Sequence, residues 1–500
     1  MDTTTVAGSA DDAATGIAGL DDILGGGLKR NRVFLFEGSP GTGKTTAALS
    51  FLIAGAAAGE RTLYVTLSET EVELRDTAAS HGWTLDDVGV FELVPPENLL
   101  DDQQQQSLLY SSDLELGETT RMILEAVETA RPSRVVIDSL SEIRLLAQGS
   151  LRYRRQVLAL KHYFARCGAT VVLLDDLTAE VADKTVHSVA HGVVRLEELA
   201  PEYGAERRRV RVTKYRGRKF RGGYHDFTIR TGGLEVFPRL VSSEHRVEFD
   251  RTPLSSNIAG LDDLLGGGVE RGSSCLILGP AGTGKSLLAL NFAISAIERG
   301  ERAALFVFDE ELGLLFQRTK AFGFDLAGLR QRGDLVIEQV DAAELSPGEF
   351  TARVRDCVTR HDVRTVVLDS LNGYQAAMPE EHFLLLHMHE LLQYLNRQGA
   401  STFLTVAQHG LVGDMRTPVD VTYLADTVLL LRYFEAMGEV RRAISVVKKR
   451  SGAHERTIRE YHIGERGLTL GEPLKQFQGV LRGIPEFVGP PPRLMEAAAE

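Results

Sequence analysis

Hydrophobic residues in this chain occur in short continuous runs, which alternate with segments of mixed apolar and polar residues. The runs span residues 33–37, 62–67, 135–138 and 170–174 in the first half, and residues 275–278, 303–308, 366–369 and 402–406 in the second. Continuous apolar runs of strand length predict strands that are buried on both faces. Alternation of such strands with helices predicts an α/β fold, in which mostly parallel sheets are flanked by helices.

The same order of elements occurs twice, which indicates a duplicated domain. Residues 17–27 read IAGLDDILGGG, and residues 258–268 read IAGLDDLLGGG. Lys44 and Lys285 keep the same offset along the chain, as do Glu69 and Glu310. We therefore predict one domain over residues 15–240 and a second over residues 255–480. Residues 241–254 are charged and polar and are expected to link them, and residues 481–500 are expected to form a C-terminal tail.

Charge and cysteine content exclude several classes of protein. The chain carries 56 Lys and Arg against 69 Asp and Glu, a net charge of −13, which argues against general binding to nucleic acid. Its three cysteines are far apart and form no CxxC pair, so disulfides and structural zinc are not expected. The polar N-terminus lacks the features of a signal peptide, and the longest apolar runs are strand-sized. We expect a cytoplasmic protein without membrane contact.

A glycine-rich segment follows the first predicted strand of each half. Residues 38–45 read GSPGTGKT and residues 279–286 read GPAGTGKS, and both match the phosphate-loop pattern GxxxxGK[ST] between a strand and a helix. Glycines let successive N–H groups point at phosphate oxygens, the lysine reaches the β- and γ-phosphates, and the hydroxyl binds Mg²⁺. The residues expected to contact ATP are Gly38, Ser39, Pro40, Gly41, Thr42, Gly43, Lys44, Thr45 and Thr46 in the first half and Gly279, Pro280, Ala281, Gly282, Thr283, Gly284, Lys285, Ser286 and Leu287 in the second.

An Asp ends a later apolar run in each half. Residues 135–138 read VVID and residues 366–369 read VVLD, and we expect Asp138 and Asp369 to hold the shell of Mg²⁺. Thr45 and Ser286 are the other predicted metal ligands. An apolar run that ends in Asp is a weak signal alone, because many strands end this way, and the preceding phosphate loop strengthens it.

Hydrolysis also requires a group that orients or deprotonates water. Candidates follow the second predicted strand of each half, namely Glu69 in the first and Asp309 and Glu310 in the second. The alternative is that these acids are solvated residues at the start of a helix, where the helix dipole favours negative charge.

Residues 207–221, RRRVRVTKYRGRKFR, form a strongly basic segment. Three interpretations are open: a nucleic-acid patch, a strand with one solvated face, or a strand that reaches the ATP of a neighbouring subunit. A matching basic set, Lys448, Lys449 and Arg450, occurs in the second half. Two copies, one for each ATP site, favour the third interpretation.

These residues give the chain a resemblance to the KaiC-type circadian clock ATPases, which are double-domain members of the RecA-like superfamily. The resemblance covers about residues 15 to 487 and includes the GxxGLDxxLGGG motifs, HGWTL at 81–85, FGFDL at 322–326 and DTVLLLRYFE at 426–435, followed by AISVVKKR and TIREY. It implies two tandem RecA-like P-loop domains, a ring of six subunits and ATP bound between neighbours.

The resemblance also implies roles for particular residues. The paired catalytic acids of the family fall on Ser68 and Glu69 in the first domain, which therefore lacks one acid, and on Asp309 and Glu310 in the second. The basic residues that act on a neighbour's nucleotide match Lys214, Arg216, Lys448 and Arg450.

The family's autophosphorylated Ser-Thr pair matches Thr422 and Tyr423, so Thr422 is the expected phosphorylation site. Our leading hypothesis is a homo-hexameric ATPase whose second domain has serine/threonine autokinase activity, used in timing or signalling with a KaiB-like or other signalling partner. One alternative is a RecA-like motor that handles DNA, which the net charge opposes. Another is a nucleotide-gated interaction hub without phosphotransfer, which the altered Thr422–Tyr423 pair supports.

Overall fold

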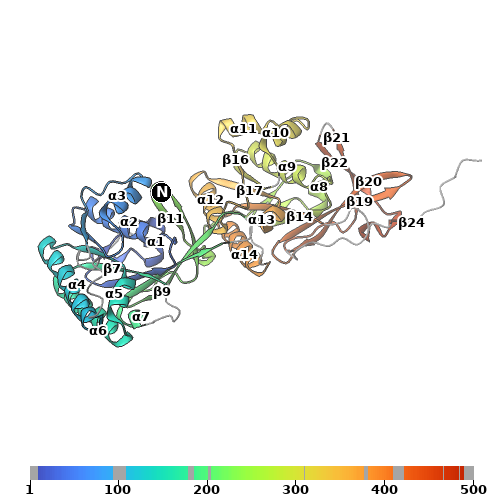
Figure 1. Cartoon of the computed structure of the whole chain (residues 1–500). Helices are drawn as coiled ribbons and strands as arrows, with labels where there is room; N and C mark the ends of the chain where they lie inside the picture. Colours follow the sequence, from blue (N-terminus) through green and yellow to red (C-terminus); the bar gives the residue numbers. More distant parts are fainter. Residues whose placement is uncertain are drawn as a thin grey trace, which may run out of the picture. The chain divides into compact units, whose positions relative to one another are not determined.

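The computed structural model describes residues 10–93, 108–177, 185–200, 204–308, 310–376, 381–408, 422–464, 467–482 and 485–488. The chain divides into two compact units, Met1–Arg239 and Leu240–Glu500 (Figure 1). No helix within the described ranges has the length and apolar character needed to cross a bilayer.

The first unit, over its described residues, is built on a nine-stranded sheet with the order β11-β10-β9-β8-β3-β7-β6-β4-β5. Strands from β8 to β5 are parallel, and β9, β10 and β11 continue the sheet in antiparallel pairing. The strands are β3 (Val33–Gly38), β4 (Thr62–Thr66), β5 (Gly89–Glu92), β6 (Arg134–Asp138), β7 (Thr170–Asp176), β8 (Gly192–Leu199), β9 (Arg207–Tyr215), β10 (His225–Arg230) and β11 (Gly233–Phe237). A short pair of strands, β1 (Asp12–Ala13) and β2 (Leu28–Lys29), forms a separate two-stranded sheet.

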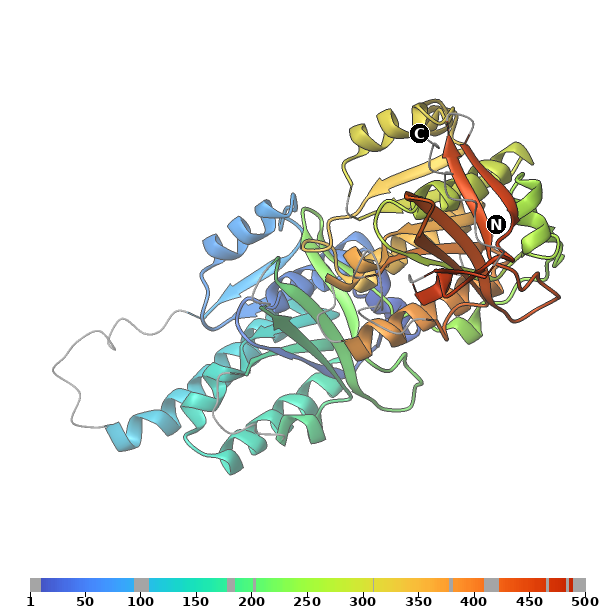
Figure 2. The same ribbon diagram turned by 90° about the vertical axis from the view of Figure 1, so that its right-hand side faces the viewer.

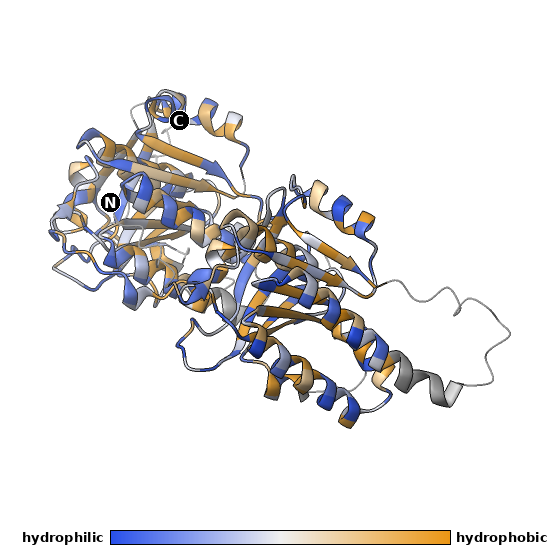
Figure 3. Ribbon diagram, turned by 90° about the vertical axis from the view of Figure 1, so that its left-hand side faces the viewer, coloured by the Kyte–Doolittle hydropathy of each residue, from blue (hydrophilic) through white to orange (hydrophobic). Residues whose placement is uncertain are grey.

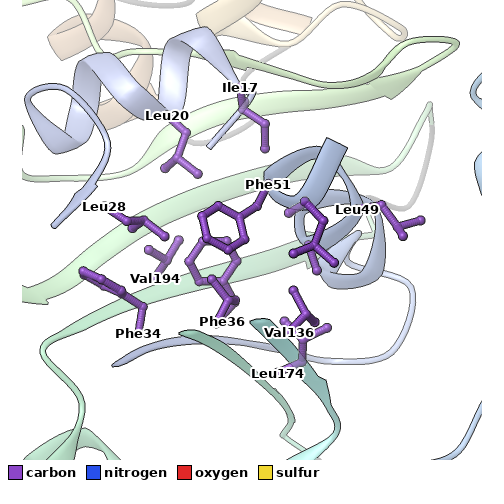
Figure 4. Packing of buried hydrophobic residues seen from close by; sticks show 14 of the residues in the cluster. Ile17, Leu20, Leu28, Phe34, Phe36, Leu49, Phe51, Val136, Leu174 and Val194 are labelled. Carbon is purple, nitrogen blue, oxygen red and sulfur yellow. The ribbon is translucent and has the colours of Figure 1, made fainter. Parts of the chain in front are cut away.

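Helices cover both faces of this sheet because its central strands are apolar on both sides. Phe34 and Phe36 of β3 pack with Phe51 of helix α2 (Figure 4). Leu35 packs on the opposite face with Phe164 of helix α6. The helices are α1 (Ala18–Leu24), α2 (Lys44–Ala57), α3 (Glu71–Ser80), α4 (Leu108–Ala130), α5 (Leu140–Ala147), α6 (Ser150–Cys167) and α7 (Thr185–Val189). The strands are mainly hydrophobic along their length, and the helices carry mixed hydropathy (Figure 3).

The second unit repeats this architecture over its described residues, with a nine-stranded sheet in the order β16-β15-β17-β18-β14-β19-β20-β21-β22 (Figure 2). The strands are β14 (Ser274–Gly279), β15 (Arg302–Val307), β16 (Leu335–Gln339), β17 (Val363–Asp369), β18 (Ser401–Ala407), β19 (Thr427–Ala436), β20 (Glu439–Lys449), β21 (Arg459–Gly464) and β22 (Gly467–Pro473). The helices are α8 (Ala259–Leu264), α9 (Lys285–Glu298), α10 (Leu312–Lys320), α11 (Leu326–Arg332), α12 (Pro347–Arg360), α13 (Leu371–Ala376) and α14 (Glu381–Arg397). The predicted α/β fold with two tandem domains and mostly parallel sheets is confirmed.

Parts of the segments expected to form the linker and the tail pair with other residues of the second unit. Within residues 241–254, the Val247 amide donates to the Arg397 carbonyl at 3.0 Å, and β12 (Pro253–Leu254) pairs with β13 (Val269–Glu270). Beyond residue 480, β24 (Glu486–Phe487) pairs with β23 (Phe477–Gln478). The described parts of both segments therefore form contacts within the second unit.

Candidate nucleotide sites

Each phosphate loop connects a central strand to a helix in the same way. In the first unit β3 ends at Gly38 and α2 begins at Lys44, and in the second β14 ends at Gly279 and α9 begins at Lys285. All the residues expected to contact ATP lie in these two loops and the first turns of their helices. Gly43 and Gly284 have φ of 89°, a left-handed conformation that glycine adopts without strain.

The loop lysines are buried and point back into their loops. Lys44 Nζ donates to the carbonyls of Gly38 at 2.8 Å and Ser39 at 2.9 Å, and Lys285 Nζ donates to the Pro280 carbonyl at 2.9 Å. Lys44 Nζ also lies 2.7 Å from Asp176 Oδ1. Burial lowers the pKa of Lys285. A buried ammonium at the start of a helix attracts anionic oxygens.

The predicted metal-binding Asp of the first unit lies beside the predicted hydroxyl ligand. Asp138 Oδ2 accepts a hydrogen bond from Tyr64 at 2.5 Å and lies 3.5 Å from Thr45 Oγ1. Burial raises the pKa of Asp138, although the bond from Tyr64 opposes this rise. Carboxylate and hydroxyl oxygens close together form a donor set that suits Mg²⁺.

The corresponding Asp of the second unit lies at the same point of its sheet. Asp369 ends β17, and its Oδ1 accepts a hydrogen bond from Thr405 at 2.5 Å. The Phe308 amide donates to the Asp369 carbonyl at 2.8 Å, as the Leu67 amide does to that of Asp138 at 2.7 Å.

Glu69 follows β4, and its main chain is held by Thr66, whose Oγ1 accepts from the Glu69 amide at 3.0 Å. The Oε2 atom of Glu69 is buried and has no hydrogen-bond partner among the described residues. Burial, and then the negative charges of Asp138, Glu73 and Asp176, raise the pKa of Glu69. A carboxylate with a raised pKa and an available oxygen is suited to accept a proton from water.

The acids of the second unit have different surroundings. Glu310 Oε2 accepts a hydrogen bond from Arg318 at 2.6 Å, so an ion pair holds this side chain. The neighbouring Glu311 caps helix α10 by accepting from the amides of Gly313 and Leu314. Asp309 lies outside the described residues.

Four basic residues bond to main-chain carbonyls in equivalent turns. Lys214 Nζ donates to the carbonyls of His187 and of Ala190, and Lys448 Nζ donates to those of Thr422 and Ala425 at 2.9 Å. The arginine two positions later bonds to the same turn in each unit, Arg216 to the Ser188 carbonyl and Arg450 to the Tyr423 carbonyl, both at 2.7 Å.

Other residues of the basic segment are paired with acids of their own unit. Arg208 lies 2.8 Å from Glu198, Arg209 lies 2.7 Å from Glu197, and Arg218 lies 2.8 Å from Asp12. Arg209 also lies over the ring of Tyr224. These pairs reduce the positive charge that the segment could offer to nucleic acid.

Sequence reasoning did not identify three residues of these sites. Tyr64 and Thr405 hold the two strand-end aspartates, and Asp176 contacts the loop lysine. The pattern LLDD at residues 173–176 was an available signal, because an apolar strand there ends in two acids. Tyr64 and Thr405 lie within apolar runs and carry no motif that marks them.

The donor sets fit ATP with Mg²⁺, since each unit combines a glycine loop, a buried lysine, a hydroxyl and a strand-end carboxylate. Bound Mg²⁺ would neutralise charge on the phosphates, with Thr45 and Asp138 or Ser286 and Asp369 as the residues that would hold it.

Comparison with known proteins identifies the family. Residues 13–241 and 254–475 each match the family described as "ATPase: KaiC". The chain is 27% identical over 482 residues to the "Circadian clock protein KaiC3" of Synechocystis sp., covering 95% of this chain and 94% of that protein. It is 29% identical over 484 residues to the "Circadian clock oscillator protein KaiC" of Thermostichus vulcanus, covering 94% and 91%. With both units matched over nearly their whole length, the chain belongs to the KaiC ATPase family.

Proposed function

We propose that this chain is a Mg²⁺-dependent ATPase with two nucleotide sites, which assembles as a homo-hexamer and phosphorylates itself on Thr422 of the second domain. The observation that carries ATP hydrolysis is Glu69, whose buried Oε2 has no partner among the described residues and whose site also contains Lys44, Thr45 and Asp138. In this proposal Glu69 takes a proton from water as the water attacks the γ-phosphate.

The sheet topology supports assembly of neighbouring subunits. Lys214 lies opposite Val193 near the start of β8, and β8 begins beside Phe34, whereas the phosphate loop follows Gly38 at the other end of β3. At 3.3 Å per residue, Phe34 and Gly38 lie roughly 13 Å apart. Lys214 and Arg216 therefore lie at the opposite end of the sheet from the phosphate loop of their own unit, and another subunit's phosphates would be their partners.

The same argument supports autophosphorylation between subunits. Thr422 precedes β19, which begins at Thr427 beside Cys275, the amino-terminal end of β14. Glu310 follows β15 at the carboxyl end of the sheet, the same end at which the phosphate loop of its own unit follows Gly279. Thr422 of one subunit would thus receive phosphate from the ATP of its neighbour, and that neighbour's Glu310 would release Arg318 and accept the hydroxyl proton.

Cytoplasmic location and a KaiB-like or other signalling partner are also parts of this proposal, and similarity to proteins named as circadian clock proteins supports them. The ion-paired basic segment favours this function over a DNA motor. The alternative function, a nucleotide-gated interaction hub without phosphotransfer, predicts that the wild type carries no phosphate in the test below.

The test is a phosphosite map of the purified chain after incubation with Mg-ATP. We expect phosphate on Thr422 in the wild type and none at that peptide in Thr422→Ala. Glu310→Gln should lower the phosphate at Thr422, with Glu311→Gln as the matched control, because Glu311 caps α10. Undiminished phosphate in Thr422→Ala would contradict the site, and no phosphate in the wild type would favour the hub.

A further inference from the structure

The two loop lysines differ in one contact that sequence motifs do not record. Lys44 Nζ has three N–H donors, and its partners among the described residues are the Gly38 carbonyl, the Ser39 carbonyl and Asp176 Oδ1, at 2.8, 2.9 and 2.7 Å. The ammonium is therefore fully coordinated by its own unit. A phosphate oxygen can bind this lysine only by replacing one of these three acceptors.

Asp176 is the acceptor that can most readily give way. Its side chain is 31% exposed, compared with 7% for Lys44, and it is a side chain at the end of a strand, whereas the other two acceptors are main-chain atoms of the loop. Asp176 pairs in register with Gly38, so its carboxylate lies at the edge of the sheet where the loop begins. Sheet order places β7 between β3 and β6, so Asp176 lies on the strand between the loop and Asp138.

The second unit lacks this carboxylate. In the equivalent strand pair, Gly279 is in register with Ala407 as Gly38 is with Asp176. Lys285 donates to the Pro280 carbonyl as Lys44 does to that of Ser39, but position 407 offers no anion. Two phosphate loops of nearly identical sequence thus hold lysines with different competitors for phosphate.

We infer that Asp176 is a positioning residue that competes with phosphate for Lys44 and so lowers the affinity of the first site for ATP. Two effects act in the same direction. ATP must displace the carboxylate from Lys44, and the displaced carboxylate then repels the negative phosphates nearby. The inference rests on the proposed binding of ATP at both loops and adds a cause for a difference between them.

The test is nucleotide affinity, measured by titration with a fluorescent ATP analogue and Mg²⁺ on full-length chains. Lys285→Ala isolates the first site, and Lys44→Ala isolates the second. In the Lys285→Ala chain, Asp176→Ala and Asp176→Asn should each lower the Kd about three- to tenfold. In the Lys44→Ala chain, Ala407→Asp should raise the Kd by a similar factor.

Glu198→Ala in the Lys285→Ala chain is the matched control. Glu198 lies near Gly41 of the loop and pairs with Arg208, so its removal changes the local charge without touching Lys44. An equal gain in affinity from Glu198→Ala, or an unchanged Kd in both Asp176 variants, would overturn the inference. A large loss of ATPase kcat in the Asp176 variants with unchanged Kd would show that Asp176 acts in hydrolysis and not in binding. That result would also overturn the inference.

The reciprocal substitution keeps the inference testable if Asp176 variants fold poorly, because an unchanged Kd in Ala407→Asp contradicts it independently. Failure of the proposed function gives a different result. If neither parental chain binds the analogue, the assignment of the loops is wrong, and the inference falls with it.

Discussion

Glu69 and Glu310 are equivalent in the two repeats, yet their carboxylates have different surroundings. Glu69 Oε2 is buried without a partner among the described residues, and an arginine holds Glu310. Because Arg318 occupies the Glu310 carboxylate whereas Glu69 keeps an oxygen available to water, we expect Glu69 to act as the base of the first site, although Ser68 replaces an expected acid.

We predict that Glu69→Gln in the Lys285→Ala chain lowers the ATPase kcat about 10²- to 10⁴-fold, because the amide cannot accept a proton. Nucleotide Kd should change little. The raised pKa of Glu69 places the acidic limb of the rate above the pH at which an ordinary glutamate titrates. Steady-state kinetics across pH measures both effects.

Glu73→Gln is the control for Glu69→Gln. Glu73 forms a capping box with Thr70 at the start of α3 and is exposed, and glutamine can keep that box. A comparable loss of kcat in both variants would show that the helix start, and not the base, was disturbed.

His225 makes the first unit sensitive to acid. The Arg239 amide donates to Nδ1 at 2.8 Å, so Nε2 carries the proton and donates to the Arg221 carbonyl at 3.0 Å. Burial lowers the pKa of His225 to about 4. The unfolded chain therefore binds more protons between pH 6.5 and 4, and stability present above pH 6.5 is lost as the pH falls through this window.

We predict that the first unit loses up to about 3 kcal/mol between pH 7 and 4 through His225. The single tryptophan, Trp83, lies in the first unit, so its fluorescence during urea unfolding reports that unit. His225→Gln should reduce the dependence on pH. An identical pH dependence in wild type and variant would assign the effect to other groups.

The turn from β3 into α2 depends on a backbone conformation that favours glycine. Gly43 has φ of 89°, and a Cβ there would lie 2.7 Å from Ile229 Cδ1 of β10. A side chain at position 43 would therefore be disfavoured both by the backbone conformation and by the contact with Ile229.

Gly43→Ala should weaken first-site ATP binding about tenfold or more, because the loop must shift to relieve both effects. Gly59→Ala is the matched control, since Gly59 has φ of 75° but an added Cβ would meet open space. It should lower the melting temperature slightly and leave the Kd unchanged. Equal losses of affinity in both variants would contradict a specific role for the loop.

The strands that carry the sites lie close to their predicted positions. The run at 33–37 became β3 (Val33–Gly38), and the run at 366–369 became the end of β17 (Val363–Asp369). Buried parallel strands can be predicted from the sequence because most of their positions are apolar. Strand β7 extends to Asp176, two residues beyond the predicted run at 170–174, because register with β3 continues after the apolar residues end.

In the proposed assembly, basic residues of a neighbouring chain would complete each nucleotide site. The basic residues Arg216 and Arg450 lie at the edge of their sheet opposite the phosphate loop of the same unit. Light scattering should therefore show a nucleotide-dependent increase in mass toward a hexamer.

Arg216→Ala and Arg450→Ala should weaken that assembly in ATP. Arg211→Ala is the control, because Arg211 lies on β9, the strand that Arg216 follows, and is in register with Arg195 farther from this edge. A wild-type chain that stays monomeric with and without ATP would contradict the roles of Arg216 and Arg450 between subunits.

The sequence by itself determined the duplication, the α/β class and the two phosphate loops, because these depend on apolar runs and on residues adjacent in the chain. Only the tertiary structure decided which distant side chains meet. Strand order brings Asp176 to Lys44 and Tyr64 to Asp138, and it leaves Ala407 at the matching place in the second unit. The tertiary structure also distinguishes the two equivalent glutamates, because it buries Glu69 Oε2 without a partner among the described residues and pairs Glu310 with Arg318. Such contacts depend on sheet order and register, which no local pattern encodes.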